Sequence, residues 1–273
     1  MNKMRKSVII LATAALALLG ASCTKLKARD QLNKGVQSFK NARYEEAINH
    51  FNEAVRLDPT LVNARLYLAT AYAQQYVPGA DTPENTAFGT NAIEEYKKVL
   101  AQDPKNVGSV KGIAYLYLQM KKFEDAKAFY RKAAEIDPND PENYYSIGVI
   151  DWTQSYQPRM EERAKLGLKP TETLNDKKVC AALKTKNADK VEEGIDALNK
   201  ALQLRPDYDD AMAYMNLMYR ERADYECDDP KARQLDLKTA DDWVDKTMAT
   251  KKARAEKQGM GGIVMEPGQG QKQ

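Results

Sequence analysis

A motif of small, large and small residues recurs along the chain, each time ahead of a proline. In the first copy, Ala47, Phe51 and Ala54 are spaced by four and then three residues, and Asp58-Pro59 follows. That spacing puts all three side chains on one face of an α-helix, and the proline ends the helix because it cannot donate a backbone hydrogen bond. The further copies are Ala92-Tyr96-Val99, Ala126-Tyr130-Ala133 and Gly194-Leu198-Ala201.

Apolar residues at helical spacing also occur outside these helices, so each copy is expected to be the second helix of a hairpin. The first helices are predicted in segments 31–40, 62–75, 107–120, 141–153 and 209–222. With these hairpins in series, most of residues 28–250 resembles the tetratricopeptide-repeat family. The resemblance implies an all-α, right-handed superhelical solenoid of five or six antiparallel helix hairpins, and a role in protein–protein interaction.

The lengths of the repeats vary along the array, which we expect to span residues 28–256. Segments 28–61 and 107–140 have 34 residues each, whereas 62–106 has 45. Pro and Gly in the surplus predict a loop insertion near 76–90. The stretch 141–208 has 68 residues, which allows one hairpin with an insertion near 155–188 or two hairpins. Helical spacing of Val179, Ala182 and Leu183 favours a separate helix over 176–186 and hence two hairpins.

The last predicted helix begins at Asp229-Pro230, a helix cap followed by proline in the first turn. It is expected to run to about Glu256 and to cap the array with a charged outer face. Residues 257–273 are rich in Gly and Gln, and we predict that they form a disordered tail.

The N-terminus has the pattern of an export signal. Basic residues precede an apolar run from Val8 to Leu19, which is too short for a full membrane span. The end of the run, Leu19-Gly20-Ala21-Ser22-Cys23, resembles a bacterial lipobox, in which the cysteine is lipidated. We therefore predict a signal peptide over 1–22, lipidation of Cys23, and a short tether over 23–27. Cleavage without lipidation and an uncleaved anchor remain alternatives, because Gly20 stands where the usual pattern has Leu.

These features predict an exported protein that is lipid-anchored to the cell envelope membrane and faces the periplasm. Two cysteines remain, Cys180 and Cys227, and in an oxidising compartment they could form a disulfide or stay as buried thiols.

The sequence offers little that predicts catalysis. Its formal charge of +3 is carried by Lys3, Arg5 and Lys6 in the leader, so the remainder is neutral and lacks the basic signature of nucleic-acid binding. The single histidine, His50, lies within a repeat helix and is expected to face solvent. Pairs such as Glu45-Glu46 recur in the first turns of repeat helices, where the helix dipole favours them. We predict no enzymatic activity, no cofactor, no metal site and no small-molecule substrate.

A partner-binding groove is the site that the family resemblance implies, because the first helices line the concave face of such arrays. Tyr and Trp on this face offer rigid, amphipathic contact area. Alternatively, Tyr145 and Trp152 pack beneath the 155–188 excursion. Residues in the helical phase for ligand contact are Leu32, Val36, Leu66, Lys111, Tyr115, Tyr145 and Trp152.

Two roles follow from these patterns. The first is a scaffold of the bacterial cell envelope that binds a peptide or helix of another protein in the groove. The second is an assembly factor for an envelope machine, such as a pilus, secretion system or outer-membrane complex, which acts through the insertions or the convex face.

Overall fold

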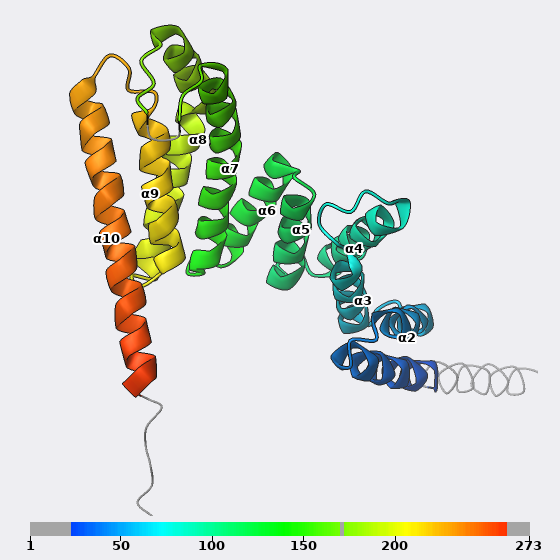
Figure 1. The fold of residues 1–273 in the computed structure, drawn as a ribbon. Coiled ribbons are helices and arrows are strands. Elements are labelled where there is room, and N and C mark those ends of the chain that lie inside the picture. Colours follow the sequence, from blue (N-terminus) through cyan, green and yellow to red (C-terminus); the bar gives the residue numbers. More distant parts are fainter. Residues whose placement is uncertain (1–22, 170–171, 261–273) are drawn as a thin grey trace, which may run out of the picture. The chain divides into compact units, whose positions relative to one another are not determined.

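The computed structural model describes residues 23–169 and 172–260, and these residues form helices and turns with no strand. They fall into two compact units, one ending at Ile136 and the other beginning at Asp137 (Figure 1). The predicted all-α class is confirmed, and both units consist of antiparallel helix hairpins. The signal peptide predicted over 1–22 lies outside the described residues.

The N-terminal unit contains three hairpins. An N-terminal helix, described over 23–40, pairs with α2; α3 pairs with α4, and α5 pairs with α6. Residues 23–27, predicted as a short tether, are exposed and form the first turn of this helix. The bounds of the other helices are α2 Tyr44–Leu57, α3 Val62–Gln75, α4 Pro83–Gln102, α5 Val107–Gln119 and α6 Phe123–Ile136.

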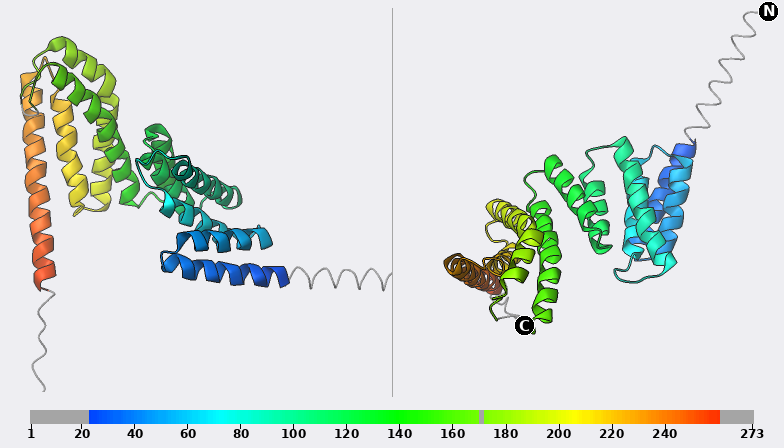
Figure 2. Two further views of the ribbon diagram at one scale, coloured as in Figure 1. Left: turned by 45° about the vertical axis from the view of Figure 1, so that its right-hand side comes forward. Right: turned by 90° about the horizontal axis from the view of Figure 1, so that it is seen from above.

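The C-terminal unit contains two hairpins built from longer helices. Helices α7 and α8 form one pair, α9 packs on both of them, and α10 pairs with α9 (Figure 2). Their bounds are α7 Pro141–Lys165, α8 Lys177–Leu204, α9 Asp209–Ala223 and α10 Pro230–Met260.

The repeated small–large–small stripe forms the core of both units. All twelve of its residues are buried, as the four-then-three spacing predicts. The helices that carry it end where the sequence indicates, one residue before Asp-Pro or Arg-Pro: α2 at Leu57, α4 at Gln102, α6 at Ile136 and α8 at Leu204.

Glycines on neighbouring helices let the large residue of the stripe approach closely. A Cβ atom added to Gly35 would lie 2.5 Å from the ring of Phe51, and one added to Gly112 would lie 2.6 Å from the ring of Tyr96. Such distances are well inside van der Waals contact, so each ring occupies the space that a larger residue would need. These contacts tie α2 to the N-terminal helix and α4 to α5.

The additional residues of the second repeat, segment 62–106, lengthen helix α4 more than they lengthen the loop before it. The connection between α3 and α4 spans only 76–82, and α4 has 20 residues. Thr82 accepts a hydrogen bond from the backbone N–H of Asn85 at 3.1 Å and Pro83 follows it, so the helix begins earlier than the predicted insertion at 76–90 implies. The side chain of Asn85 fixes the short loop by bonding Val77 N–H and the carbonyls of Val77 and Ala80.

The stretch 141–208 forms one hairpin, so the preferred interpretation as two hairpins is wrong. Residues 177–204 are a single helix, capped by Asp176, rather than a short helix over 176–186 followed by another. Helix α7 likewise continues through Pro158 to Lys165. The additional residues therefore extend both helices of the fourth hairpin beyond the ordinary repeat length.

A cluster of buried charges holds the extended end of this hairpin to α9. Arg159 lies 2.9 Å from Glu221 and from Asp224, and Arg163 lies 2.7 Å from Asp224. Arg163 is only 1% exposed and also donates to the carbonyls of Lys169 and Glu172 in the α7–α8 turn. Asp224 accepts hydrogen bonds from both arginines and so avoids the large cost of an isolated buried ion, whereas the buried oxygens of Glu221 face Arg159 without a hydrogen bond.

Cys180 of α8 and Cys227 of the α9–α10 connection meet beside this cluster. Their Cα atoms lie 6.0 Å apart, within the usual range for a disulfide, and the structure joins them as one. The bridge would tie the start of α8 to the segment that leads into α10.

The last helix begins at Pro230 as predicted, and Asp229 caps it by accepting from Lys231 N–H and Ala232 N–H at 3.0 Å each. It continues to Met260, so residues 257–260 are helical and the predicted disordered tail begins too early. The rest of that tail, 261–273, lies outside the described residues.

Replacing Gly112 by Ala is expected to destabilise the N-terminal unit by about 1–3 kcal/mol, because the added methyl must displace the Tyr96 ring. The ring is 5% exposed and its hydroxyl lies 3.1 Å from the Thr70 hydroxyl. Urea unfolding followed by circular dichroism measures the change. Gly108→Ala on the same helix is the control: a Cβ there meets only Asn106 Oδ1, at 3.6 Å, and should leave stability unchanged or raise it. Equal effects of the two substitutions would contradict the close approach.

The C-terminal unit is expected to lose stability relative to Glu221→Gln as pH rises from about 4.5 to about 7. Burial raises the pKa of Glu221 to about 7 against the attraction of Arg159, whereas the unfolded chain ionises this group near 4.5. Over that window the unfolded state gives up the proton first, so the free energy of unfolding falls by on the order of 3 kcal/mol and then levels off. Both tryptophans, Trp152 and Trp243, lie in this unit, so tryptophan fluorescence in urea reports on it alone.

The exposed Glu161 provides the control for this measurement, because Glu161→Gln should show the same pH dependence as the unchanged protein. If the free energy of unfolding depends on pH in the same way for the unchanged protein and for Glu221→Gln, the raised pKa of Glu221 is contradicted.

Candidate partner-binding surface

Three of the predicted groove residues in the N-terminal unit serve packing. Leu32 and Val36, on the N-terminal helix, are half-buried against a cluster that contains Phe51 and Leu68. Leu66, on α3, packs against a second cluster around α4 and α5. Part of each side chain is therefore taken up by packing within the unit.

The exposed aromatic residues of this unit lie next to those positions. Tyr115 of α5 was predicted for the groove and is 51% exposed, and Lys111, one turn before it, is half-buried. Tyr67 of α3 is 38% exposed and was missed, because the helical phase assigned to α3 was one residue off. Its ring stacks on Phe51 with the centroids 5.5 Å apart, so one face is fixed by packing.

Tyr145 and Trp152 are brought together in the C-terminal unit by a shared neighbour, Tyr214. The Tyr145 and Tyr214 ring centroids lie 5.7 Å apart, and those of Trp152 and Tyr214 lie 5.4 Å apart. Tyr208 and Tyr156 continue the row, at 4.8 Å from Tyr145 and from Trp152 respectively. We call this row the aromatic ladder; it runs in the order Tyr208, Tyr145, Tyr214, Trp152 and Tyr156.

Two first helices of successive hairpins build the aromatic ladder. Tyr145, Trp152 and Tyr156 are spaced by seven and four residues on α7, which puts them on one face, and Tyr214 extends from α9 beside them. The ring contacts of Tyr145 are therefore with Tyr214 of α9 and with Tyr208, the residue just before α9. Trp152 contacts Tyr214 and also Tyr156, which belongs to the 155–188 stretch. All rungs except the buried Tyr208 remain half-buried, so part of each ring still faces outward.

Charged groups close both ends of the aromatic ladder. Glu142 accepts hydrogen bonds from the Tyr208 hydroxyl at 2.6 Å and from Arg205 at 2.8 Å. At the other end the Arg159 guanidinium lies 5.7 Å from the centre of the Tyr156 ring. Burial raises the pKa of Tyr145 and of Tyr214, so both hydroxyls stay protonated at neutral pH and can donate. The surface is thus apolar in the middle, with neutral hydroxyls and a charge at either end.

The remaining candidate groups have structural partners. His50, expected to face solvent, is partly buried and its Nδ1 lies 2.8 Å from Gln31 Oε1. Asp209 forms an ion pair with Arg254 at 2.6 Å. The described residues contain no group of three or more His, Cys, Asp or Glu side chains placed to hold a metal ion. Over the described part of the chain, every helix is also too short or too polar to span a bilayer.

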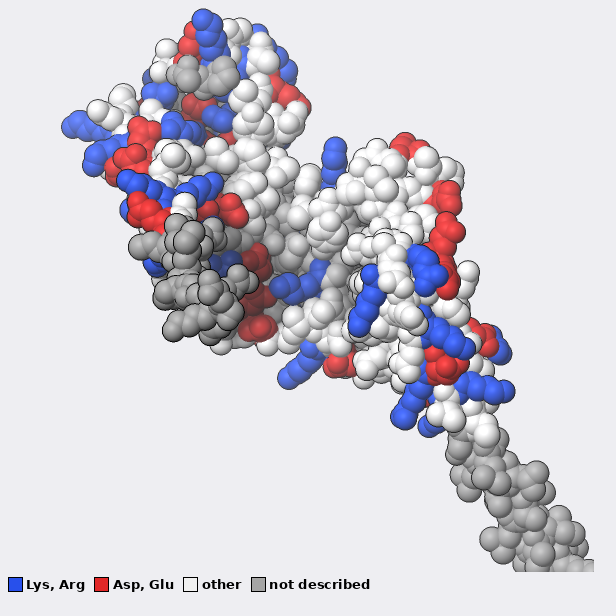
Figure 3. All heavy atoms as spheres, turned by 60° about the horizontal axis from the view of Figure 1, so that its bottom comes forward, with Lys and Arg blue, Asp and Glu red and all other residues white. Residues whose placement is uncertain are grey.

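Charge is mixed over the surface. In the face shown in Figure 3, Lys and Arg side chains lie interspersed with Asp and Glu in both units, without a broad patch of one sign.

Comparison with known proteins identifies the repeats. Residues 38–75 match a family model described as TPR repeat, and residues 90–147 match one described as tetratricopeptide repeat. A peroxisomal targeting signal receptor of Saccharomyces cerevisiae is 27% identical over 225 residues, 79% of this chain and 36% of the receptor. An Hsp70-Hsp90 organizing protein of Triticum aestivum is 30% identical over 115 residues, 42% of this chain. The chain spans only 18% of the length of the wheat protein.

Solved structures agree on the fold. A MamA protein superposes with a TM-score of 0.58 at 13% identity, covering 88% of this chain and 98% of its own. YrrB, described as a TPR protein with an unusual peptide-binding site, superposes with a TM-score of 0.51 at 13% identity, covering 82% of this chain and 90% of its own. At such low identity these structures show the fold alone. Residues 38–75 and 90–147 therefore carry tetratricopeptide repeats, and the described residues share the fold of tetratricopeptide-type helical solenoids.

Proposed function

We propose that this protein is a non-catalytic scaffold of the bacterial cell envelope that binds a peptide or helix of a partner protein. The observation that carries the proposal is the aromatic ladder, which the first helices α7 and α9 present together. Tetratricopeptide repeats act in protein–protein interaction, and the ladder offers Tyr and Trp, the residue types that most often dominate binding energy at interfaces.

The arrangement of the ladder suits a peptide better than a small molecule. Its rings run along two helices as a strip with polar groups at its ends, whereas small-molecule sites are enclosed. Neighbouring rings hold one another in place, so a ligand would lose little side-chain entropy on binding. The names of two similar proteins, a targeting signal receptor and a TPR protein with a peptide-binding site, agree with a peptide ligand.

The proposed location rests on the leader. Residues 1–22 have the basic start and apolar run of an export signal, and Cys23 follows the small residues that signal peptidases prefer. Cys23 is exposed at the start of the first described helix, where an attached lipid would not disturb packing. We infer a lipid-anchored protein that faces the periplasm.

The extended end of the α7–α8 hairpin supports the second role, an assembly factor that acts through its insertion. Leu166, at the turn, is 39% exposed, and the buried charges behind it hold the turn against α9. Deleting residues 155–174, the end of α7 together with most of the turn, would remove Arg159 and Arg163 and so damage the fold. A surface substitution at Leu166 is therefore the sharper test.

Replacing Tyr145 or Trp152 by Ala is expected to reduce recovery of crosslinked partners from the envelope by roughly tenfold, since truncating an interface hot spot costs about 1.4 kcal/mol or more. Quantitative mass spectrometry after affinity purification of the full chain measures recovery. Leu166→Glu is the matched comparison and should retain the partners. The opposite pattern, loss only with Leu166→Glu, favours the assembly role, and unchanged recovery with all three variants would refute the ladder as a binding surface. Thermal unfolding of each variant confirms that the fold is kept.

The mature protein is expected to begin at Cys23 and to carry a diacylglycerol group on that residue. Intact-mass measurement of protein from membranes, with peptide sequencing of the N-terminus, tests both points. The same sample treated with a thiol-alkylating reagent before reduction should show Cys180 and Cys227 unmodified, because export leads to an oxidising compartment. An unmodified N-terminus or a retained leader would contradict lipidation, and alkylation of both cysteines would contradict the bridge.

A further inference from the structure

The outer flank of α10 is not covered by another described helix, whereas α2, α4 and α8 each pack against the first helix of the next hairpin. Residues Ala240, Val244 and Thr247 repeat the four-then-three spacing of the core stripe, and Ala240 and Thr247 are buried like their counterparts. Val244, at the position of the large residue, is 38% exposed. The four counterparts of Val244 are between 0% and 6% exposed: Phe51, Tyr96, Tyr130 and Leu198.

The contacts of those counterparts explain the difference. Phe51 of α2 stacks on Tyr67 of α3, and Tyr96 of α4 reaches Gly112 of α5, so in each case the large residue contacts the next hairpin. No described residue follows α10 in that position. Val244 therefore lacks the contact that buries its counterparts.

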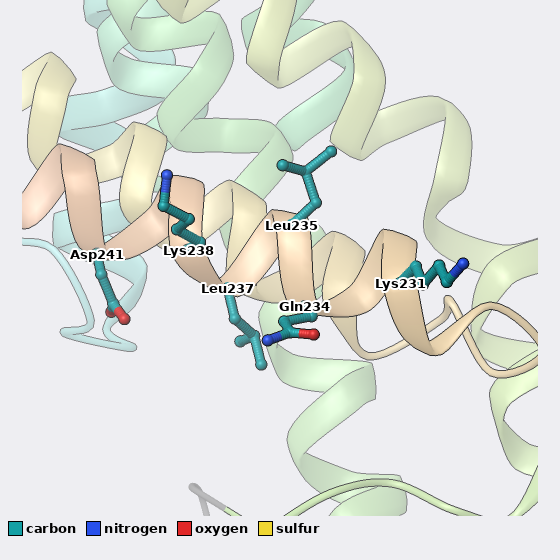
Figure 4. A pocket seen from close by; sticks show the side chains of 6 residues that line it. All are labelled: Lys231, Gln234, Leu235, Leu237, Lys238 and Asp241. Carbon is teal, nitrogen blue, oxygen red and sulfur yellow. The ribbon is translucent and has the colours of Figure 1, made fainter.

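This flank carries a regular stripe that extends well beyond Val244. At about 100° per residue, Leu237 and Met248 lie within about 40° of Val244 on the helix surface. Met248 is 64% exposed, and Leu237 is half-buried. Figure 4 shows Leu237 and Asp241 projecting from the same side of α10, whereas Leu235 projects from the other side. An open hollow of about 500 Å³ along this part of the helix is lined from both sides, by Leu235 as well as by Leu237 and Asp241.

The stripe follows a strict alternation of four and three residues over almost three heptads. Spacing of this kind is the sequence signature of helices that pair along their length. Its members are Leu237, Asp241, Val244, Met248, Lys251 and Ala255.

The order of chemistry along the stripe is the same from either end: apolar, charged, apolar, apolar, charged, apolar. The two charges are opposite, an acid at Asp241 and a base at Lys251. A second copy of this helix, laid antiparallel, would therefore set apolar against apolar and acid against base at every position. A two-fold axis requires this self-complementarity, because both copies use the same surface.

We propose that α10 binds α10 of a second copy of the chain, in an antiparallel pair related by a two-fold axis. Val244 then meets the partner's Met248, Leu237 meets the partner's Ala255, and Asp241 pairs with the partner's Lys251. Each contact occurs twice. The inference is independent of the groove-binding proposal, since the aromatic ladder lies on α7 and α9.

The length and charges of α10 support a second copy as the occupant. With 31 residues α10 is about 46 Å long, about twice the length of the 15-residue α9, and residues 251–257 are exposed. Asp241 already pairs with Arg220 at 2.7 Å, but both side chains are substantially exposed, so the pair is weak and one carboxylate oxygen remains for a lysine. An unrelated helix would have no reason to match an acid and a base placed symmetrically about Val244 and Met248.

Reversal of the two charges tests the pairing. Two full-length copies with different C-terminal tags are expressed in the same cell, the membranes are solubilised in detergent, and one tag is used to recover the other. Lys251→Asp in both copies places acid against acid, and Asp241→Lys places base against base, so each should lower recovery roughly tenfold. The double variant with both reversals restores opposite charges and should regain recovery.

Lys257→Asp is the matched control, because it reverses an exposed lysine six residues beyond Lys251 on a different face of α10. It should leave recovery unchanged. Val244→Glu should abolish recovery while circular dichroism shows unchanged helix content. Absence of recovery between unchanged copies would overturn the second copy as occupant, and so would a double variant that fails to regain recovery although it folds.

Discussion

The fold depends on one packing arrangement, in which a large side chain on one helix fills space that small residues on neighbouring helices leave open. Phe51 over Gly35 and Tyr96 over Gly112 show it directly. Because Phe51 and Tyr96 also contact the next hairpin, repeats within a unit depend on their neighbours for burial of their own cores. The same dependence explains why the end of the array is exposed at Val244, where the stripe continues and no described hairpin follows.

The C-terminal unit modifies this plan with charge. Its fourth hairpin is longer than the repeat requires, and the added turns cannot be covered by a stripe of repeat length. Arg159 and Arg163 instead bind Glu221 and Asp224 of α9 in a buried cluster. Removing one partner of such a cluster would leave a buried charge uncompensated, at a cost of about 3–5 kcal/mol. The cluster thus fixes the orientation of the extended hairpin. It also fixes the end of the aromatic ladder at Tyr156, since Arg159 lies over the ring of that residue.

Two surfaces of the C-terminal unit are proposed for different partners. The aromatic ladder lies between first helices, is rigid, and suits an extended segment of another protein. The stripe on α10 lies on the last helix and matches a second copy of itself. A scaffold of this kind could be paired through one surface while it binds through the other, because no residue is shared between them.

The sequence by itself determined the local structure. It set the start of α10 at Asp229-Pro230, the buried face of each repeat, and the helix ends that lie two residues before Pro59, Pro104, Pro138 and Pro206. Each of these depends on the chemistry of a few neighbouring residues. Only the tertiary structure decided that the extended end of α7 is held against α9, since Arg163 and Asp224 are 61 residues apart in the chain and their pairing leaves no local signal. It also decided that Leu66 packs while Tyr67 stays exposed, because an error of one residue in helical phase turns a side chain by about 100°. Exposure at a particular position depends on how neighbouring helices cross, and that is settled by packing among residues distant in sequence.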